Sequence, residues 1–393
     1  MTYRIPFSSD EYARRVSKVQ TMMREHGFDV LICQDPANMC WLTGYDSWSF
    51  YTPQCVVLGV DDARPTWFGR PQDAKAAVVT TGLPAENIAT YSEALVHRAD
   101  GHPYDDLCAH LRDRGAGAAR IAVELDAHYY TARAHRHLVD GLADATFADS
   151  GELVNWAKAV KSEPELDLMR QAGRICTQTM VAAIEKLAPG VPESEVVAEV
   201  YARQTLGVDG VSGDYISLCP LIQVGEGTST PHLTWSEAPL PDDTLIVMEL
   251  AGARRHYTVP ISRTVHLGKP PQAVADLSKV IVEGGDVALE TARPGATCEE
   301  VEAVWQAVLN RNGYEKQSRV GYSIGLAFPP DWGERTMSLR PGDTTVLEVG
   351  MCFHFQSGVW LNDFGAAISE PFVVTPRRGE RLTKVERDLI VID

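Results

Sequence analysis

Short apolar runs separated by amphipathic stretches organise the first part of the chain. The runs DVLICQ (29–34), CVVLGV (55–60) and RIAVEL (120–125) are typical of buried strands, because each is brief, apolar and bounded by polar residues. A helical pattern precedes the first run; it can begin at Ser8 or Ser9, whose hydroxyl suits an N-cap, and continue to about His26. The pattern predicts an N-terminal α/β domain.

A second domain is predicted from about residue 153. The segment NWAKAVKSEPELDLMRQAGRICTQTM predicts one long helix starting there, because its apolar residues recur every three or four positions. This face comprises Leu166, Met169, Gly173, Cys176, Met180 and Ile184. We therefore expect residues 1–155 and 156–393 to form two domains, the second large but plausible for one core.

Two segments of the second domain share the same pattern of helix-boundary residues. IEKLAPGVPESEV (184–196) and LETARPGATCEEV (289–301) each contain a helix end, a Pro-Gly break and a new helix start rich in glutamate. One explanation is chance, because these residues are common at helix boundaries. The other is an internal duplication, which would give two helix-and-strand halves facing each other across a sheet. In a duplicated domain we expect a site between the halves.

The net charge and the cysteine pattern argue against some kinds of partner and some cellular locations. With 36 Lys and Arg against 53 Asp and Glu, the formal charge of -17 disfavours nucleic acid and anionic membranes. The eight cysteines form no CxxC pair, which favours free thiols in a reducing compartment. No run of about 18 apolar residues and no basic-then-apolar leader occurs, so we expect a cytoplasmic protein.

The candidate chemistry lies between residues 224 and 375. The ordered motifs are the PH turn at 231–232, MELAG, YTVPISRT, GYSIGL at 321–326, GMCFHFQSG at 350–358 and AISEPFVVT at 367–375. In order and spacing, over nearly the whole chain, they resemble the creatinase/prolidase/methionine-aminopeptidase family. The resemblance implies an α/β N-terminal domain plus an α+β pita-bread catalytic domain with pseudo-two-fold symmetry, which agrees with the repeat.

Metal-binding members of that family hold two metal ions with two Asp, one His and two Glu. Carried over in chain order, these positions fall on Glu249, Pro260, Tyr322, Gln356 and either Ser369 or Glu370. Divalent ions need several anionic or imidazole ligands, and at most two of the five positions keep one. We therefore expect a metal-free site without a cofactor.

Creatinase, a metal-free member, hydrolyses a C–N bond in a guanidino compound. The resemblance to this branch implies a metal-independent hydrolase that opens a cyclic amidine, a small zwitterion with a cationic amidinium and a carboxylate. Glu249, with Glu370 nearby, is expected to face the amidinium. Glu249 attacks the amidine carbon, the route slightly favoured without a metal to activate water, or acts as general base on water, or serves as a simple counter-ion.

Other residues are assigned to proton transfer and binding. His232 of the PH turn is the expected proton donor, since histidine exchanges protons near neutral pH, and His354 is a weaker candidate. Arg335 is expected to bind the substrate carboxylate, because the resemblance places an arginine in this loop, whereas Arg340 is expected to face solvent. The expected contacts to the ring come from Tyr257, Tyr322, Trp332 and Gln356, although core packing explains each aromatic residue equally well.

Two partners are expected. The loop LTGYDSWSFYTPQ (42–54) is rich in aromatic and small polar residues, which is typical of an interface or a lid. The resemblance implies a homodimer in which Tyr45 or Trp48 reaches the neighbouring site. The implied product carries an acetyl group, so a downstream deacetylase is the expected functional partner.

Two alternatives come from other classes. One is a metal-dependent Xaa-Pro peptidase, which the fold invites and the altered ligand positions oppose. The other is a non-catalytic pita-bread binding protein, which the retention of Glu249, His232 and Glu370 opposes, because a degenerate site needs no titratable groups. GEGTST (225–230) is not a dinucleotide fingerprint, since it lacks a third spaced glycine and a following helix.

Overall fold

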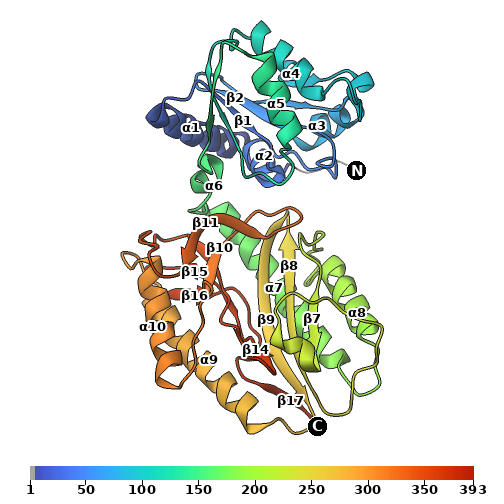
Figure 1. Ribbon diagram of the computed structural model, residues 1–393, viewed down its shortest axis with the longest axis vertical. Coiled ribbons are helices and arrows are strands. Elements are labelled where there is room, and N and C mark those ends of the chain that lie inside the picture. The colour runs from blue at the N-terminus through green and yellow to red at the C-terminus, as the bar shows by residue number, and fades with distance from the viewer. Residues whose placement is uncertain (1–4) are drawn as a thin grey trace. The chain divides into compact units, whose positions relative to one another are not determined.

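The computed structural model describes residues 5–393, which divide into two units between Lys158 and Ala159 (Figure 1). The sequence places the domain boundary after residue 155; residues 1–4 of the expected first domain lie outside the described residues. Within residues 5–393, no helix is both long enough and apolar enough to cross a bilayer.

The first unit is built on a mixed six-stranded sheet of order β4-β3-β2-β1-β5-β6, in which β1 is antiparallel to β2 and parallel to β5. The predicted runs at 29–34, 55–60 and 120–125 contain β1, β2 and β5, so the α/β prediction is confirmed. The strands are β1 (Val30–Cys33), β2 (Cys55–Gly59), β3 (Thr66–Gly69), β4 (Ile88–Thr90), β5 (Arg120–Val123) and β6 (Thr146–Asp149). The helices are α1 (Ser9–His26), α2 (Pro36–Thr43), α3 (Ala74–Thr80), α4 (Pro103–Asp113), α5 (Ala132–Gly141) and α6 (Leu153–Ala157).

The long helix predicted from residue 153 is in fact two helices. α6 ends before Lys158, and α7 (Glu163–Lys186) begins after Ser162. Ser162 and Glu165 form a capping box, in which the Ser162 N–H donates to Glu165 Oε2 at 2.8 Å. Pro164 occupies the first turn, where no backbone donor is needed. The single-helix prediction was wrong because apolar periodicity does not register this new helix start.

The second unit repeats one order of elements: two helices followed by three strands. The first half contains α7, α8 (Glu193–Leu206), β7 (Leu221–Val224), β8 (Thr244–Arg254) and β9 (Tyr257–Leu267). The second half contains α9 (Gln272–Thr291), α10 (Cys298–Arg311), β10 (Gly321–Ile324), β11 (Gly333–Leu339) and β12 (Cys352–Phe355). The two similar segments, 184–196 and 289–301, are the α7–α8 and α9–α10 junctions. This supports the duplication over the chance explanation.

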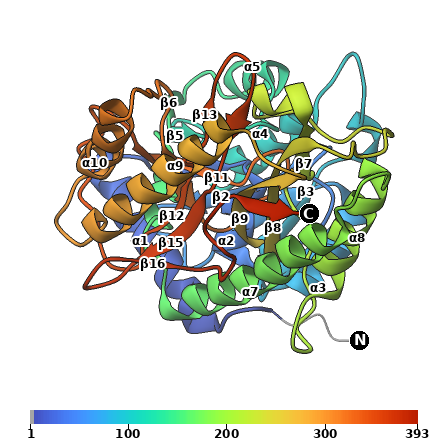
Figure 2. The ribbon, with the colours of Figure 1, turned by 90° about the horizontal axis from the view of Figure 1, so that it is seen from below.

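The strands of the second unit form two main sheets, of order β17-β9-β8-β7 and β11-β10-β12-β15-β16. Figure 2 shows α7 and α8 on one side of these strands and α9 and α10 on the other, as does Figure 1. The remaining strands are β13 (Val359–Trp360), β14 (Gly365–Ala366), β15 (Glu370–Val374), β16 (Gly379–Arg381) and β17 (Ile390–Ile392). The sheets are joined where Ser369 N–H donates to Ser262 O at 3.1 Å.

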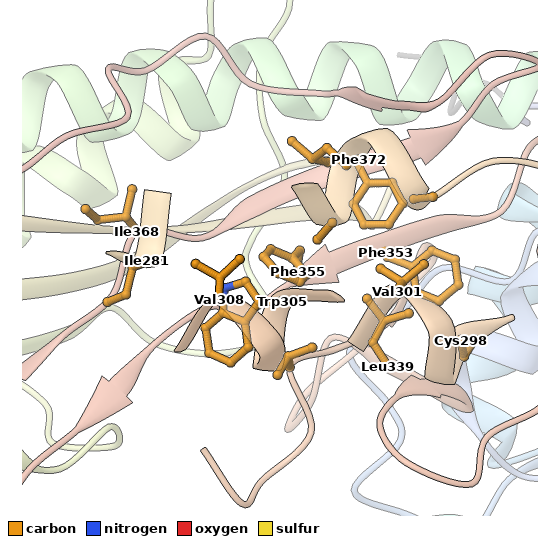
Figure 3. Packing of buried hydrophobic residues seen from close by; sticks show 14 of the residues in the cluster. Ile281, Cys298, Val301, Trp305, Val308, Leu339, Phe353, Phe355, Ile368 and Phe372 are labelled. Carbon is orange, nitrogen blue, oxygen red and sulfur yellow. The ribbon is translucent and has the colours of Figure 1, made fainter. Parts of the chain in front are cut away.

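The core beneath α9 and α10 fixes which residues of β12 are available for chemistry. Phe353 stacks on Phe372 with ring centroids 5.3 Å apart, and Phe355 meets Trp305 edge to face at 6.0 Å (Figure 3). Burying each of these rings contributes about 2 kcal/mol. Since side chains alternate along a strand, His354 and Gln356 lie on the opposite face from these rings.

Candidate functional site

The centre of the site is a carboxylate held by an amide between the two halves of the second unit. Glu249 on β8 lies opposite Ser262 on β9 in the antiparallel ladder. Gln356 Nε2 donates to Glu249 Oε2 at 2.8 Å and to Ser262 Oγ at 3.0 Å. The amide therefore directs its nitrogen toward Glu249, and Gln356 Oε1 is buried without a hydrogen-bond partner among the described residues. Burial raises the pKa of Glu249 to about 7, although Lys316 and the Gln356 amide act in the opposite direction.

A chain of hydrogen bonds beside Glu249 holds the His354 ring. Trp332 Nε1 can only donate, and it does so to the Tyr322 hydroxyl at 2.7 Å. The Tyr322 hydroxyl is hydrogen-bonded to His354 Nδ1, 2.9 Å away. His354 Nε2 is hydrogen-bonded to Ser369 Oγ at 2.8 Å, so both ring nitrogens have partners.

His354 lies close to Glu249 but is unsuited to carrying a second proton. Its Nδ1 is 3.9 Å from Glu249 Oε1. Burial, with smaller contributions from the charges of Lys316 and Arg319, lowers the pKa of His354 to about 3. The imidazole is therefore neutral at pH 7 and acts as a rigid link between Tyr322 and Ser369.

Lys316 is a site residue that the sequence analysis missed. It lies between α10 and β10, buried, with Nζ donating to Gly358 O at 2.6 Å and standing 4.3 Å from the centroid of the Trp360 ring. Burial lowers its pKa to about 7, and the charge of Glu249 opposes that shift. No local sequence signal marks it, because its neighbours Glu315 and Gln317 are exposed and the stretch is polar like a solvated loop.

Contrary to the expectation from the sequence, the Glu370 carboxylate pairs with arginines and does not join Glu249. It is buried among three arginines: Arg263 at 2.7 Å, Arg381 at 3.1 Å and Arg387 at 3.4 Å. Of the two residues left open for the last family position, Ser369 contacts the site, through His354 and through the Ser262 N–H at 2.6 Å. Adjacent residues of an extended chain point to opposite sides, so Glu370 serves the ion-pair cluster instead.

The aromatic residues proposed as ring contacts separate into two groups. Tyr257 is buried, and its hydroxyl donates to Glu165 Oε1 at 2.7 Å, at the start of α7. Tyr322 and Trp332 belong to the site, where they pack with an apolar cluster containing Ala251 and Ala327. This cluster provides an apolar wall near the Glu249 carboxylate.

Within the described part of the chain, no hydrogen bond or ion pair joins Glu249 to His232 or Arg335. His232 is exposed in a loop whose backbone is held by Gln223, which donates to Pro231 O at 3.3 Å and Leu233 O at 2.7 Å. Arg335 lies on β11 in the left-handed region, with φ of 54°, near the point where the β10–β11 register shifts. The roles of both residues stay predictions. Arg340 is exposed, as expected.

In the first unit, the aromatic loop at 42–54 has a buried part and an exposed part. Tyr45 is buried, with its hydroxyl 2.7 Å from Ser49 Oγ and its ring against Trp67. Tyr45 thus packs inside its own unit, contrary to its proposed reach into a neighbouring site. Trp48 and Tyr51 are 55% and 59% exposed, so Trp48 is the predicted contact that remains available.

The donor set around Glu249 does not suit a divalent metal. Within residues 5–393, no group of three or more His, Cys, Asp and Glu side chains is arranged to hold one. The site offers one carboxylate, the three hydroxyls of Ser262, Tyr322 and Ser369, an amide and a neutral imidazole already bonded through both nitrogens. Such a set lacks the several anionic ligands that paired divalent ions require.

Comparison with known proteins assigns the family. Residues 15–160 match the creatinase/prolidase N-terminal domain, and residues 167–376 match metallopeptidase family M24. The chain belongs to metallopeptidase family M24. The solved structure of a prolidase from Thermococcus sibiricus has the same fold, with a TM-score of 0.85 at 18% identity over 98% of this chain and 100% of that one.

Relatives of this M24 chain include proteins of nearly the same length. It is 40% identical to ectoine hydrolase from Halomonas elongata, over 98% of both chains. It is 41% identical to an uncharacterized hydrolase/peptidase from Sinorhizobium fredii, over 98% of this chain and 99% of that one. The predicted family and the two-domain pita-bread fold are confirmed.

Proposed function

We propose that this protein is an ectoine hydrolase, which opens the cyclic amidine ring of ectoine, and of hydroxyectoine as a related substrate, to an N-acetyl-diaminobutyrate. The full-length similarity to the Halomonas elongata enzyme supports the substrate. The observation that carries the chemistry is the buried Glu249 carboxylate paired with the Gln356 amide at a position where metal-binding members hold an ion.

The acceptors of the site match the donors of an amidinium. Glu249 presents carboxylate oxygens, and Gln356 presents Oε1, which is buried without a partner among residues 5–393. An amidinium offers two N–H donors and one delocalised positive charge, so it satisfies both acceptors and neutralises Glu249. The wall formed by Tyr322 and Trp332 suits the apolar part of the ring.

Ionised Glu249 starts the reaction by either of two routes. As general base, it takes a proton from water while the water oxygen bonds to the amidine carbon. As nucleophile, it bonds to that carbon itself, and water later releases the acyl group. In both routes the carbon–nitrogen bond breaks, the ring nitrogen gains a proton, and one water is consumed. A pKa of about 7 suits Glu249 to accept and return a proton near neutral pH.

The proton donor to the leaving nitrogen is a residue other than His354, since the pKa of His354, near 3, keeps it neutral. His232 remains our proposed donor. Substrate binding would have to bring the leaving nitrogen toward the PH turn, whose backbone Gln223 holds in place.

We extend the proposal to metal independence and to partners. The donor set around Glu249 supports a reaction in which no step requires a metal ion. We also propose a cytoplasmic homodimer in which the exposed Trp48 reaches the neighbouring site. A deacetylase would consume the acetylated product.

The proposal is tested by incubating the purified full chain with ectoine and following the ring protons by NMR. We expect their loss together with the appearance of an acetamide methyl signal. Cleavage of a Xaa-Pro dipeptide without opening of ectoine would favour the peptidase alternative. Peptide binding without turnover of any amidine or guanidino compound would favour the non-catalytic alternative.

A further inference from the structure

Lys316 is an ammonium buried without a carboxylate partner. Among the described residues no Asp or Glu oxygen lies within ion-pair distance of Nζ, whose one hydrogen bond goes to the Gly358 carbonyl. A buried charge that lacks an ion-pair partner is costly, and a protein retains one where a ligand or a reaction uses it. The Lys316 ammonium can therefore pair with an anionic group of a ligand.

The ammonium is held in a fixed place. It stands over the Trp360 ring, 4.3 Å from the centroid. That ring is packed between two glycines: a Cβ at Gly358 would come within 2.5 Å of Trp360 Cη2, and one at Gly365 within 2.7 Å of Cδ1. The indole N–H of Trp360 is itself buried without a partner in the part of the chain that is described. The platform under Lys316 therefore has little room to shift.

The two charges of the site are near each other but not paired. Lys316 acts electrostatically on both Glu249 and His354, yet it lies beyond ion-pair distance of Glu249. The site therefore presents two acceptors, Glu249 and Gln356, and a nearby cation that is not paired with either of them. This pattern is complementary to a small zwitterion whose cationic and anionic groups sit on the same ring.

We propose that Lys316 binds the carboxylate of a zwitterionic cyclic amidine and so determines the preference of the site for that class of substrate. The proposal rests on the proposed function and adds the residue that recognises the acid group. Arg319 is less suited to the role, because it is exposed and occupied by the Tyr322 ring at 4.5 Å and Ser338 Oγ at 3.2 Å. Arg335 is the rival assigned from the sequence, and the experiment separates the two.

The test compares ectoine with the same cyclic amidine lacking the carboxylate, using the full chain and its Lys316→Met, Lys316→Arg and Arg335→Met variants. We expect wild type to prefer ectoine by roughly 100-fold in kcat/KM, since truncating a buried charge-assisted contact has about that effect. Lys316→Met should remove the preference, mainly through the KM for ectoine. Lys316→Arg should retain part of it.

The ratio between the two substrates is an internal control, because any effect of Lys316 on Glu249 changes both rates alike. Equal losses for both substrates in Lys316→Met would overturn the proposal in favour of a counter-ion role. Loss of the preference in Arg335→Met alone would overturn it in favour of Arg335. Wild type that opens both rings equally well overturns it without any variant, even if Lys316→Met does not fold. If wild type opens neither ring, the proposed function fails and this inference falls with it.

Discussion

Glu249 and Glu370 are both buried glutamates of the second unit, but their surroundings differ. Glu370 lies among Arg263, Arg381 and Arg387, all within 3.4 Å. Within residues 5–393, Glu249 has one hydrogen-bond donor, the Gln356 amide, and the Lys316 ammonium lies beyond ion-pair distance of it. One carboxylate is compensated by the fold itself, whereas the other keeps an incompletely satisfied charge that burial makes costly.

This difference separates a structural role from a chemical one. The ion pairs of Glu370 join β15 to β9 through Arg263, which also donates to Ser369 O at 2.8 Å and Ser262 O at 2.8 Å. The Arg263 contacts thus fix the backbone on which Ser262 and Ser369 present their side chains to the site. In the proposed function, by contrast, Glu249 gains its full complement of partners only when a cationic ligand binds.

The largest expected effect is on catalysis at Glu249. Glu249→Gln keeps the shape of the side chain but removes the base or nucleophile, so kcat for ectoine should fall about 10³-fold or more. Its thermal stability should not decrease, because an uncompensated buried carboxylate is replaced by a neutral amide. Steady-state assays with ectoine measure kcat, and thermal unfolding measures the stability. A kcat within tenfold of wild type would contradict the assignment.

The matched variant Glu370→Gln should affect folding instead. It leaves three arginines around a neutral amide, so the free energy of unfolding should fall by about 3–5 kcal/mol, while the folded fraction keeps its kcat within a few fold. Urea titration and active-site-normalised assays measure this. If Glu370→Gln abolished turnover at unchanged stability, the comparison would be reversed.

A smaller effect is expected at Tyr322. Tyr322→Phe leaves the Trp332 N–H and His354 Nδ1 without their shared partner, which should cost about 1–3 kcal/mol of stability and lower kcat/KM as His354 loses its fixed orientation. Tyr257→Phe is the control, because it removes the buried hydrogen bond to Glu165 at the start of α7. Equal losses of kcat/KM in the two variants would argue against a site role for Tyr322.

The subtlest effect is on pH dependence. Activity requires ionised Glu249, and burial raises its pKa from the usual 4.5 to about 7, so kcat/KM should rise with pH through neutrality. The Lys316 charge lowers the pKa of Glu249, so Lys316→Met should move this acid limb to higher pH. A pH–rate profile measures both. An acid limb near the ordinary range of glutamate, or one that Lys316→Met leaves in place, would show that Glu249 is not the titrating group.

Local patterns predicted the fold and part of the site. The strands of the first unit, the capped start of α1 and the repeated helix junctions were accessible because apolar period and helix caps are local properties. Glu249, Tyr322 and Gln356 were found because each occupies a recognisable position in a family motif.

The remaining site residues depend on contacts between distant parts of the chain. Lys316 donates a hydrogen bond to Gly358, which lies 42 residues away in the sequence. The Tyr257 hydroxyl donates to Glu165, which lies 92 residues away in the sequence. The choice between Ser369 and Glu370 depends on which of two adjacent side chains faces His354, which a one-residue ambiguity in alignment conceals. Tyr45 and Trp48 have the same aromatic character, and only packing against Trp67 distinguishes the buried residue from the exposed one.

The most direct test of the central claim is turnover of ectoine by protein that has been stripped with a chelator and whose residual metal content has been measured. We predict ring opening at the same rate as in the untreated protein, with far less than one metal ion per chain. Loss of activity that returns on adding a divalent ion would contradict the account, because it would mean that the residues around Glu249 hold a metal after all.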